Sequence, residues 1–147
     1  MGKVKVIARN KNAYHDYNIL EELECGIVLV GTEIKSIRLG KVSINESYCQ
    51  IKNNKLLIFD MNISFYDQGN IFNHKEKRDR ELLAHKKEIR KLGQKVKLEG
   101  LTIIPLSVYL KDGLCKVNIA LAKGKKNYDK REDLKKEDAR KSVKRYI

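Results

Sequence analysis

The last 25 residues of the chain are too charged to form part of a hydrophobic core. From Lys123 to Ile147 there are 11 Lys or Arg and 5 Asp or Glu, with few apolar side chains between them. Such a segment cannot bury enough apolar surface to offset the entropy lost on ordering. We therefore expect residues 123–147 to be a tail that is disordered until bound. Residues 1–122 must then supply the fold, which is enough for one domain.

The positive charge of the chain is concentrated in two segments. The tail carries a net +6 of the formal +13, and the segment from Asn73 to Lys97 carries another +6, with 10 basic and 4 acidic residues. Charge gathered in this way indicates a polyanionic partner.

Composition argues against a membrane protein and against a disulfide framework. No apolar run approaches the ~20 residues that span a bilayer, and the N-terminus lacks the apolar segment of a signal peptide. Cys25, Cys49 and Cys115 are widely spaced and odd in number, which predicts reduced, buried thiols rather than disulfides or a zinc site. We expect a soluble, cytoplasmic monomer without a cofactor.

The first half of the chain predicts strands and one short helix. Residues 17–29 mix apolar and acidic side chains and predict two short strands broken near Gly26. Thr32 to Leu39 predicts a helix, with Thr32 as its cap and Gly40 as its stop. Residues 48–51 and 56–61 flank Asn53-Asn54, which predicts a tight antiparallel hairpin.

The second half predicts one long helix and another hairpin. Asn73 to Leu92 combines a cap-like Asn73 with a narrow apolar stripe and Gly93 just beyond, so this segment is predicted to be the longest helix. Residues 101–110 and 114–121 flank Asp112-Gly113, a strong hairpin signal, and Pro105 would mark an edge or a bulge. Together these elements favour a mainly β fold, a small antiparallel barrel of the oligonucleotide-binding (OB) type.

A catalytic site is not predicted. The histidines His15, His74 and His85 belong to no catalytic motif, and the last two are expected among surface charges of the long helix. No phosphate-binding loop motif is present. Asp60 and Asp67 are the one candidate pair for a magnesium-dependent nuclease, although such aspartates are commonly turn residues.

The combination of several tyrosines with many basic residues indicates RNA binding. Flat rings can stack on unpaired bases for ~1 to 3 kcal/mol each while Lys and Arg hold phosphates. The candidates are Tyr14, Tyr17, Tyr48, Tyr66, Tyr109 and Tyr128. For Tyr66 and Tyr109 we prefer the alternative of half-buried structural residues.

Several stretches of the chain are distinctive in their order and length: N-K-N-A from Asn10, D-Y from Asp16, E-C-G-I-V-L-V-G-T-E-I-K-S-I-R from Glu24, S-Y from Ser47, N-H-K-E-K-R-D-R-E-L-L-A-H-K-K-E-I from Asn73, G-L-T-I-I-P-L from Gly100 and A-L-A-K-G-K-K-N-Y-D-K-R from Ala120. Together they resemble the small protein B family, which binds transfer-messenger RNA. The resemblance implies a closed OB barrel with about three flanking helices. It also implies a role in trans-translation, the rescue of ribosomes stalled on messages without a stop codon, and no enzymatic activity.

The resemblance also implies which residues contact RNA. The face for the transfer-RNA-like domain of transfer-messenger RNA falls on Asn10, Tyr17, Glu24, Tyr48, Lys123, Gly124, Lys125 and Lys126. A carboxylate such as Glu24 can accept hydrogen bonds from base amino groups or 2′-hydroxyls, although a structural ion pair with a neighbouring Lys is an open alternative. Gly124 could let the backbone approach a phosphate, or could simply mark the exit from a strand.

The resemblance further implies that the tail becomes helical in the empty messenger channel of the small ribosomal subunit. The implied ribosome contacts are Tyr128, Asp129, Lys130, Arg131, Lys135, Lys136, Arg140, Lys141, Lys144 and Arg145. Tyr128 stands where the family often has an aromatic ring that stacks on a decoding-centre base. Pairs such as Glu132 with Lys136 support a helix by only a few tenths of a kcal/mol, so docking must supply the rest.

Two other functions stay open. One is a basic barrel that binds any structured RNA, as an RNA chaperone or ribosomal protein would. The other is the nuclease at Asp60 and Asp67, which would need magnesium.

Overall fold

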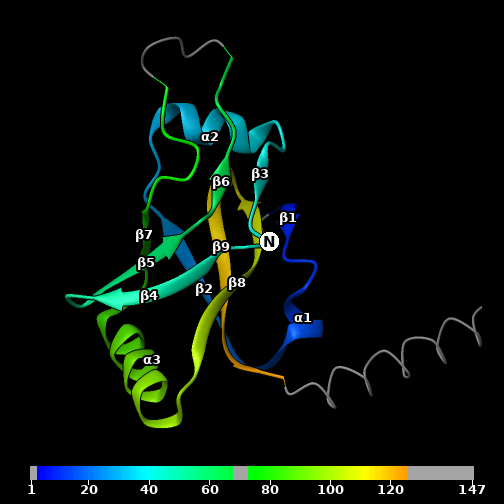
Figure 1. The fold of residues 1–147 in the computed structure, drawn as a ribbon. Helices are drawn as coiled ribbons and strands as arrows, with labels where there is room; N and C mark the ends of the chain where they lie inside the picture. The colour runs from blue at the N-terminus through cyan, green and yellow to red at the C-terminus, as the bar shows by residue number, and fades with distance from the viewer. Residues whose placement is uncertain (1–2, 68–72, 126–147) are drawn as a thin grey trace, which may run out of the picture.

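The computed structural model describes residues 3–67 and 73–125, where strands alternate with three helices (Figure 1). The strands are Val4–Arg9 (β1), Tyr17–Ile27 (β2), Val42–Ser43 (β3), Tyr48–Lys52 (β4), Lys55–Phe59 (β5), Asn62–Ile63 (β6), Arg80–Leu83 (β7), Thr102–Lys111 (β8) and Leu114–Gly124 (β9). The helices are Ala13–Asp16 (α1), Gly31–Arg38 (α2) and Lys86–Glu99 (α3). In Figure 1, α2 and α3 lie at opposite ends of the molecule.

Six strands close into a barrel. Their order is β8, β4, β5, β7, β2 and β9, all neighbours are antiparallel, and β9 pairs back with β8. Each of the six strands therefore has a partner on both sides, although β4 meets β8 at one residue pair and β2 meets β7 at two. β1 adds to β8 beside β4, while β3 and β6 form a small separate ladder. The prediction of a mainly β, closed antiparallel barrel with three helices is confirmed.

Both predicted hairpins are confirmed. Asn53 and Asn54 have φ of 51° and 62°, and Asp112 and Gly113 have φ of 52° and 80°. Positive φ at both central residues is the geometry of the type I′ turn, whose twist matches that of paired strands. The predicted irregularity at Pro105 is also confirmed, since the β8–β9 register shifts between Pro105 and Ser107.

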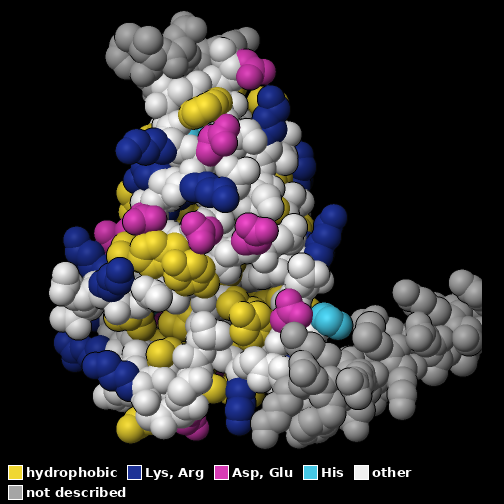
Figure 2. Space-filling model, viewed as in Figure 1, with side chains coloured by type: hydrophobic (Ala, Val, Ile, Leu, Met, Phe, Trp, Pro, Cys, Tyr) yellow, Lys and Arg dark blue, Asp and Glu magenta, His cyan; other side chains and the backbone are white. Residues whose placement is uncertain are grey.

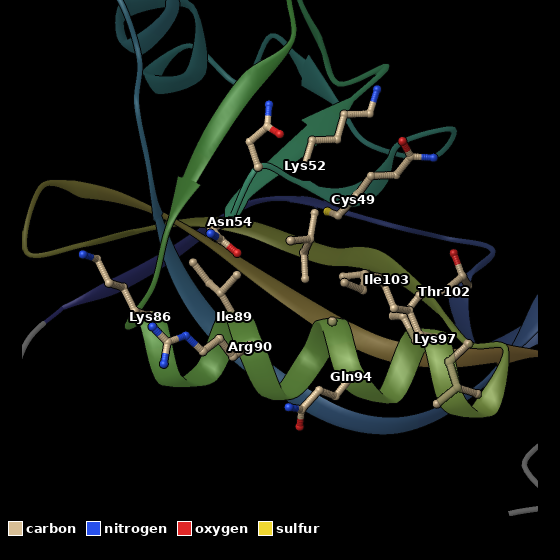
Figure 3. A pocket seen from close by; sticks show the side chains of 16 residues that line it. Cys49, Lys52, Asn54, Lys86, Ile89, Arg90, Gln94, Lys97, Thr102 and Ile103 are labelled. Atoms are coloured by element: carbon tan, nitrogen blue, oxygen red, sulfur yellow. The ribbon is translucent and has the colours of Figure 1, made fainter.

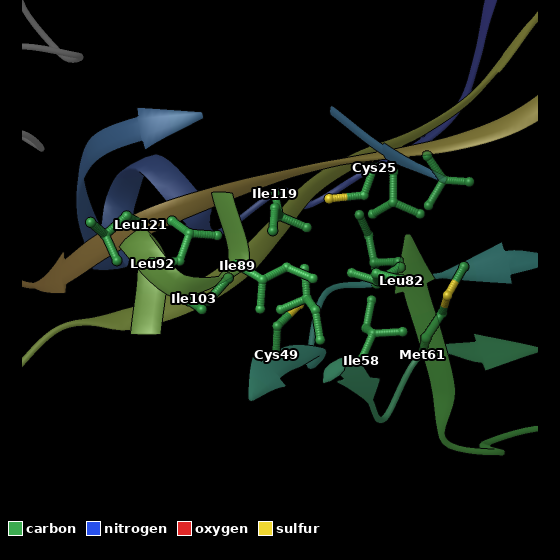
Figure 4. Close-up of a cluster of buried hydrophobic side chains, with 14 of the residues drawn as sticks. Cys25, Cys49, Ile58, Met61, Leu82, Ile89, Leu92, Ile103, Ile119 and Leu121 are labelled. Atoms are coloured by element: carbon green, nitrogen blue, oxygen red, sulfur yellow. The ribbon is translucent and has the colours of Figure 1, made fainter. Parts of the chain in front are cut away.

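The barrel interior is filled by buried aliphatic side chains from every side of the ring (Figure 4). A second cluster lies outside it, where Ile104, Leu106, Ala120 and Ala122 pack with Ala13 of α1. The alternation along residues 114–121 predicts one core face and one open face, the latter carrying Lys116, Asn118 and Ala120. Lys116 and Asn118 are indeed partly exposed, but the prediction is wrong for Ala120, which packs with Ala13 of α1.

The segment predicted as two strands forms one, β2, which ends at Ile27. β2 continues through Gly26, which pairs with Leu83 of β7 and Lys116 of β9. A Cβ at Gly26 would lie 3.4 Å from the Leu83 Cβ, so glycine here allows close packing rather than a break. The irregularity of the strand is a register shift between Ile19 and Glu21.

The predicted helix from Asn73 to Leu92 is wrong. Its first half contains strand β7, in which Arg80 and Leu82 are buried while Leu83 is exposed. Leu82 pairs with Ile27 of β2 and Leu56 of β5, so a strand here is needed to complete the ring. Helix α3 begins only at Lys86 and passes through the predicted stop at Gly93. It ends at Gly100, where φ is 64°.

The helix predicted at Thr32–Leu39 is confirmed as α2, but Thr32 does not cap it. The cap position is Val30, whose N–H donates to Glu33 Oε1 at 2.9 Å. The Thr32 hydroxyl instead bonds His74 Nδ1 at 2.8 Å. His74 is buried, with Nε2 2.8 Å from the Ile63 carbonyl oxygen, so the expectation that it lies among surface charges is wrong.

A buried carboxylate joins α2 to the barrel. Glu33 accepts hydrogen bonds from Arg78 Nη2 at 2.6 Å and from Arg80 Nε, and both Glu33 and Arg80 are buried. Burial alone would raise the pKa of Glu33, but hydrogen bonds from Arg78 and Val30 and the charge of Arg80 outweigh it and lower the pKa. Burial lowers the pKa of Arg80, but the arginine side chain stays protonated in proteins. The pair is therefore ionised at neutral pH.

We expect Glu33→Gln to destabilise the fold by roughly 3–5 kcal/mol at neutral pH, because it leaves the Arg80 guanidinium buried without a counter-charge. An unfolded glutamate titrates near 4.5, and the folded pKa of Glu33 lies lower. The ionised form therefore stabilises the fold fully above pH 4.5 and ceases to do so as the pH falls through the folded pKa. Urea denaturation at both ends of this range measures the effect.

The matched control is Glu21→Gln. Glu21 Oε2 accepts from Lys95 Nζ at 2.7 Å, a similar separation in an exposed pair. Its loss should cost at most about 1 kcal/mol. Equal losses for the two variants would contradict the structural role given to Glu33.

Candidate nucleic-acid interface

A small hollow of about 350 Å³ gathers three of the predicted RNA-binding residues. Asn10, Tyr17 and Tyr48 all line it, although they come from different parts of the chain. The other lining residues are Asn12, Ala13, Asp16, Asn45, Glu46, Ser47, Thr102 and Ile104. The hollow lies where α1, the start of β2 and the start of β4 meet.

Asn10 shapes the hollow. Its Nδ2 donates to the Pro105 carbonyl oxygen at 3.0 Å, and its Oδ1 accepts from the Asn12 N–H at 3.3 Å. The Asn10 N–H also donates to the Leu106 carbonyl oxygen at 2.8 Å. These bonds fix the chain between β1 and α1 against β8, so the contribution of Asn10 is to position the wall of the hollow.

Tyr48 supplies an aromatic surface at the edge of the hollow. It is 39% exposed and stacks on Phe59, with the ring centroids 5.3 Å apart and the planes inclined by 22°. Lys52 Nζ lies 5.1 Å from the centroid of the Phe59 ring. An exposed ring already held by a second ring can stack on a base with little loss of side-chain freedom.

The basic end of β9 lies beside the hollow. Gly124 pairs with Tyr17, and Lys123 pairs with Asn18. The Lys125 N–H donates to the Asp16 carbonyl oxygen at 2.9 Å, and its Nζ donates to the Tyr14 carbonyl oxygen at 2.7 Å. Lys123 and Gly124, assigned to the tail from the sequence, are thus the last residues of a strand. Lys126 lies outside the described residues.

Neither steric crowding nor backbone conformation requires a glycine at position 124. A Cβ built there meets no heavy atom within 4 Å, and its φ is not positive. Both alternatives given for this residue therefore remain, since it does end a strand and the space above it is open to a ligand.

Glu24 is not part of the hollow. It lies seven residues further along β2, accepts from the Tyr109 hydroxyl, and has Lys111 Nζ 3.5 Å from its Oε1. The hydrogen bond from Tyr109 is the main cause that lowers the pKa of Glu24, with Lys111 adding to it. The structure thus contains the ion pair considered as the alternative role of Glu24.

The two tyrosines predicted to be structural are half-buried. Tyr109 bonds Glu24, and burial together with that bond raises its pKa. Tyr66 lies after β6, outside any strand, with Lys35 Nζ 5.4 Å from its ring centroid.

Sequence reasoning missed most of the polar lining of the hollow. Asn12 lies in the stretch N-K-N-A but was not named as a contact, and Asn45 and Glu46 belong to no quoted stretch. The three residues meet only because α1 packs beside the turn before β4. Asn45 Oδ1 accepts from the Lys11 N–H at 3.0 Å and ties that turn to the start of α1. The hollow contains two carboxylates, Asp16 and Glu46, and no Lys or Arg.

The described part of the chain gives little support to the alternative of a magnesium-dependent nuclease. Asp60 occupies a turn with φ of 57°, and the exposed Asp67 pairs with Lys41 at 3.5 Å. Residues 3–67 and 73–125 contain no group of three or more His, Cys, Asp or Glu that could hold a metal. Within the same ranges, no helix is both long and apolar enough to cross a membrane.

The cysteines are free, as predicted. Cys25 and Cys49 are buried and Cys115 is partly buried. Burial raises the pKa of Cys25 to about 12 and that of Cys115 to about 11, so neither thiol is activated. The residues predicted to contact the ribosome, from Tyr128 to Arg145, lie outside the described residues.

Comparisons with known proteins agree on one family. The model of the SmpB protein family matches residues 7–147. The "SsrA-binding protein" of Carboxydothermus hydrogenoformans is 52% identical over 143 residues, which cover 97% of this chain and 96% of that protein. The "SsrA-binding protein" of Enterococcus faecalis is 51% identical over 146 residues, or 99% and 95% of the two chains.

A solved structure is also similar. It is described as "tmRNA-SmpB: a journey to the center of the bacterial ribosome". It superposes with a TM-score of 0.68 and 43% sequence identity, covering 81% of this chain and 84% of that one.

We expect Tyr109→Phe to raise the pKa of Glu24 towards 4.5, because the variant removes the hydroxyl that donates to its carboxylate. A carbon-detected NMR titration of the Glu24 carboxyl measures this. Replacing Lys111 with Met should raise the same pKa by less. An unchanged pKa in Tyr109→Phe would show that the hydrogen bond does not form in solution.

Proposed function

Because the chain belongs to the SmpB protein family, we propose that it binds transfer-messenger RNA (tmRNA, also called SsrA RNA) and delivers it to stalled ribosomes in trans-translation. The relatives carry the name SsrA-binding protein, and the similar solved structure is a tmRNA–SmpB assembly in the bacterial ribosome. Identity near 50% over almost the whole chain supports transfer of this function. Its partners are tmRNA and the ribosome, and its place of action is the cytoplasm, where ribosomes translate.

One observation supports the barrel as the part that recognises RNA. Asn10, Tyr17 and Tyr48, separated by up to 38 residues of sequence, converge on one hollow with the basic end of β9 alongside it. Amide, carboxylate and aromatic groups can read base edges and faces, while Lys123 and Lys125 can hold nearby phosphates. Glu24 lies seven residues beyond Tyr17 along β2. It would either contact a second part of the RNA or have only a structural role in its ion pair with Lys111.

The remaining residues of the chain are proposed to act on the ribosome. The residues beyond Lys125 would become helical in the messenger channel of the small subunit, a space that is empty only when the message has run out. Tyr128, Asp129, Lys130, Arg131, Lys135, Lys136, Arg140, Lys141, Lys144 and Arg145 are the proposed contacts. Recognition of this kind makes and breaks no covalent bond, so no catalytic role is proposed.

We expect Tyr48→Ala to weaken binding of the transfer-RNA-like fragment of tmRNA by ~1–3 kcal/mol, the contribution of one stacked base. Fluorescence anisotropy against ordinary transfer RNA measures both affinity and preference. Phe65→Ala is the control, because Phe65 is an exposed ring (51%) outside the hollow. If the unmodified protein bound both RNAs equally, non-specific RNA binding would be the better description.

We expect the double change Lys130→Ala with Arg131→Ala to leave binding of the same fragment intact and to abolish rescue of ribosomes stalled at the end of a message. The tail supplies ribosome contacts rather than tmRNA recognition in this proposal. An in vitro translation assay on a message without a stop codon measures rescue. Full rescue by this variant would refute the role given to the tail.

A further inference from the structure

A larger groove of about 780 Å³ lies between α3 and the β4–β5 hairpin (Figure 3). Its floor is apolar, with Ile51 of β4, Ile89 and Val96 of α3, and Ile103 of β8. Its polar lining includes Gln50, Asn53, Asn54, Gln94 and Thr102. The groove is open along α3, and its lining includes none of the RNA or ribosome contacts that the family resemblance implies.

Four cations line this groove and no carboxylate does. Lys86, Arg90 and Lys97 lie on one face of α3, since intervals of four and seven residues return to the same side of a helix. Lys52 of β4 also borders the groove, but its side chain extends away from α3, with Nζ 5.1 Å from the centroid of the Phe59 ring (Figure 3). Figure 2 shows Lys and Arg side chains around the lower left of the molecule, where Figure 1 places α3 and β4. Three cations on one face of α3, with no carboxylate in the lining of the groove, create a positive potential that favours an anionic partner.

The remaining lysines of α3 provide a useful contrast. Lys87 and Lys91 are exposed on the same helix but do not line the groove. Lys95 continues their face and donates to Glu21 Oε2 on β2. The charge on α3 is thus divided between a face that lines the groove and a face directed toward the acidic strand β2.

The groove and the hollow adjoin each other. Thr102 lines both, and β4 passes from one to the other, with Tyr48 at the hollow and the next four residues, Cys49 to Lys52, along the groove. The two sites differ in chemistry. The hollow has amides, rings and two carboxylates without a cation, whereas the groove has four cations without a carboxylate or an aromatic ring.

We propose that the RNA bound at the hollow continues along α3, with its phosphates held by Lys86, Arg90 and Lys97. The hollow then reads bases and sets preference, and the groove supplies affinity that does not depend on sequence. The identity of this RNA as tmRNA rests on the proposed function. The position of the groove next to the hollow, with Thr102 lining both, favours RNA over an acidic peptide, which the apolar floor would also accommodate.

The test compares two full-length double variants that remove equal charge from one helix. Arg90→Gln with Lys97→Gln removes groove cations, and Lys87→Gln with Lys91→Gln removes cations outside the groove. Affinity for the transfer-RNA-like fragment and for ordinary transfer RNA is measured over a salt series. Because each phosphate contact contributes about 0.7 to 0.9 to the slope of log affinity against log salt, losing two contacts should make that slope shallower by about 1.4 to 1.8.

We expect the groove variant to show this change, with similar fold-losses for both RNAs and so an unchanged preference. The control variant should keep nearly the original slope. Equal slopes in the two variants would overturn the proposal, because only overall charge would then matter. If the unmodified protein shows no preference for the fragment, the proposed function fails instead, so the two failures are distinguishable.

A second measurement identifies the occupant directly. Amide NMR shifts of Gly93 and Lys52 should change on addition of the RNA fragment to the full-length protein. Changes caused by poly-glutamate and not by RNA would assign the groove to an acidic protein partner and overturn the proposal.

Discussion

The carboxylate of Glu33 is out of contact with solvent and lies between two guanidinium groups, and much of the fold depends on this arrangement. Arg80 is held by Glu33 and donates in addition to the Met61 carbonyl oxygen at 2.7 Å and the Arg78 carbonyl oxygen at 2.9 Å. One side chain therefore ties α2, the residue before β6 and the start of β7 together. β7 pairs with both β5 and β2, so the interaction that fixes Arg80 also helps to close the ring.

The same interaction explains why part of the sequence was misread. Turn signals are local, and Asn53-Asn54 and Asp112-Gly113 predicted both hairpins from two residues each. The apolar residues between Asn73 and Leu92 fit a helix as well as a strand followed by a helix. What decides between them is the burial of Arg80, and its partner Glu33 is 47 residues away. No local pattern predicts that an arginine points inward.

The candidate interface could be predicted only in part, for a similar reason. Asn10, Tyr17 and Tyr48 were named through the family resemblance, and the structure brings them to one hollow. Glu24, named in the same way, lies apart with Tyr109 and Lys111. Arg90 and Lys97 belong to a basic segment that the sequence does identify, yet composition cannot separate them from Lys87 and Lys91. The face of a helix that lines a groove depends on packing, here of Ile89 and Leu92 into the core.

The place where the chain leaves the barrel determines how mechanical load would pass through the molecule. β9 is hydrogen-bonded on both sides, to β2 and β8, and its last pair joins Gly124 to Tyr17 at the margin of the hollow. A pull on the chain beyond Lys125 therefore acts on a strand secured on two sides, close to the point where a ligand in the hollow would be anchored. The path along which force passes from the chain beyond Lys125 to a ligand in the hollow is short and does not include the α2 end of the barrel. Tension between that ligand and a partner bound to the chain beyond Lys125 would therefore leave the buried Glu33–Arg80 pair undisturbed.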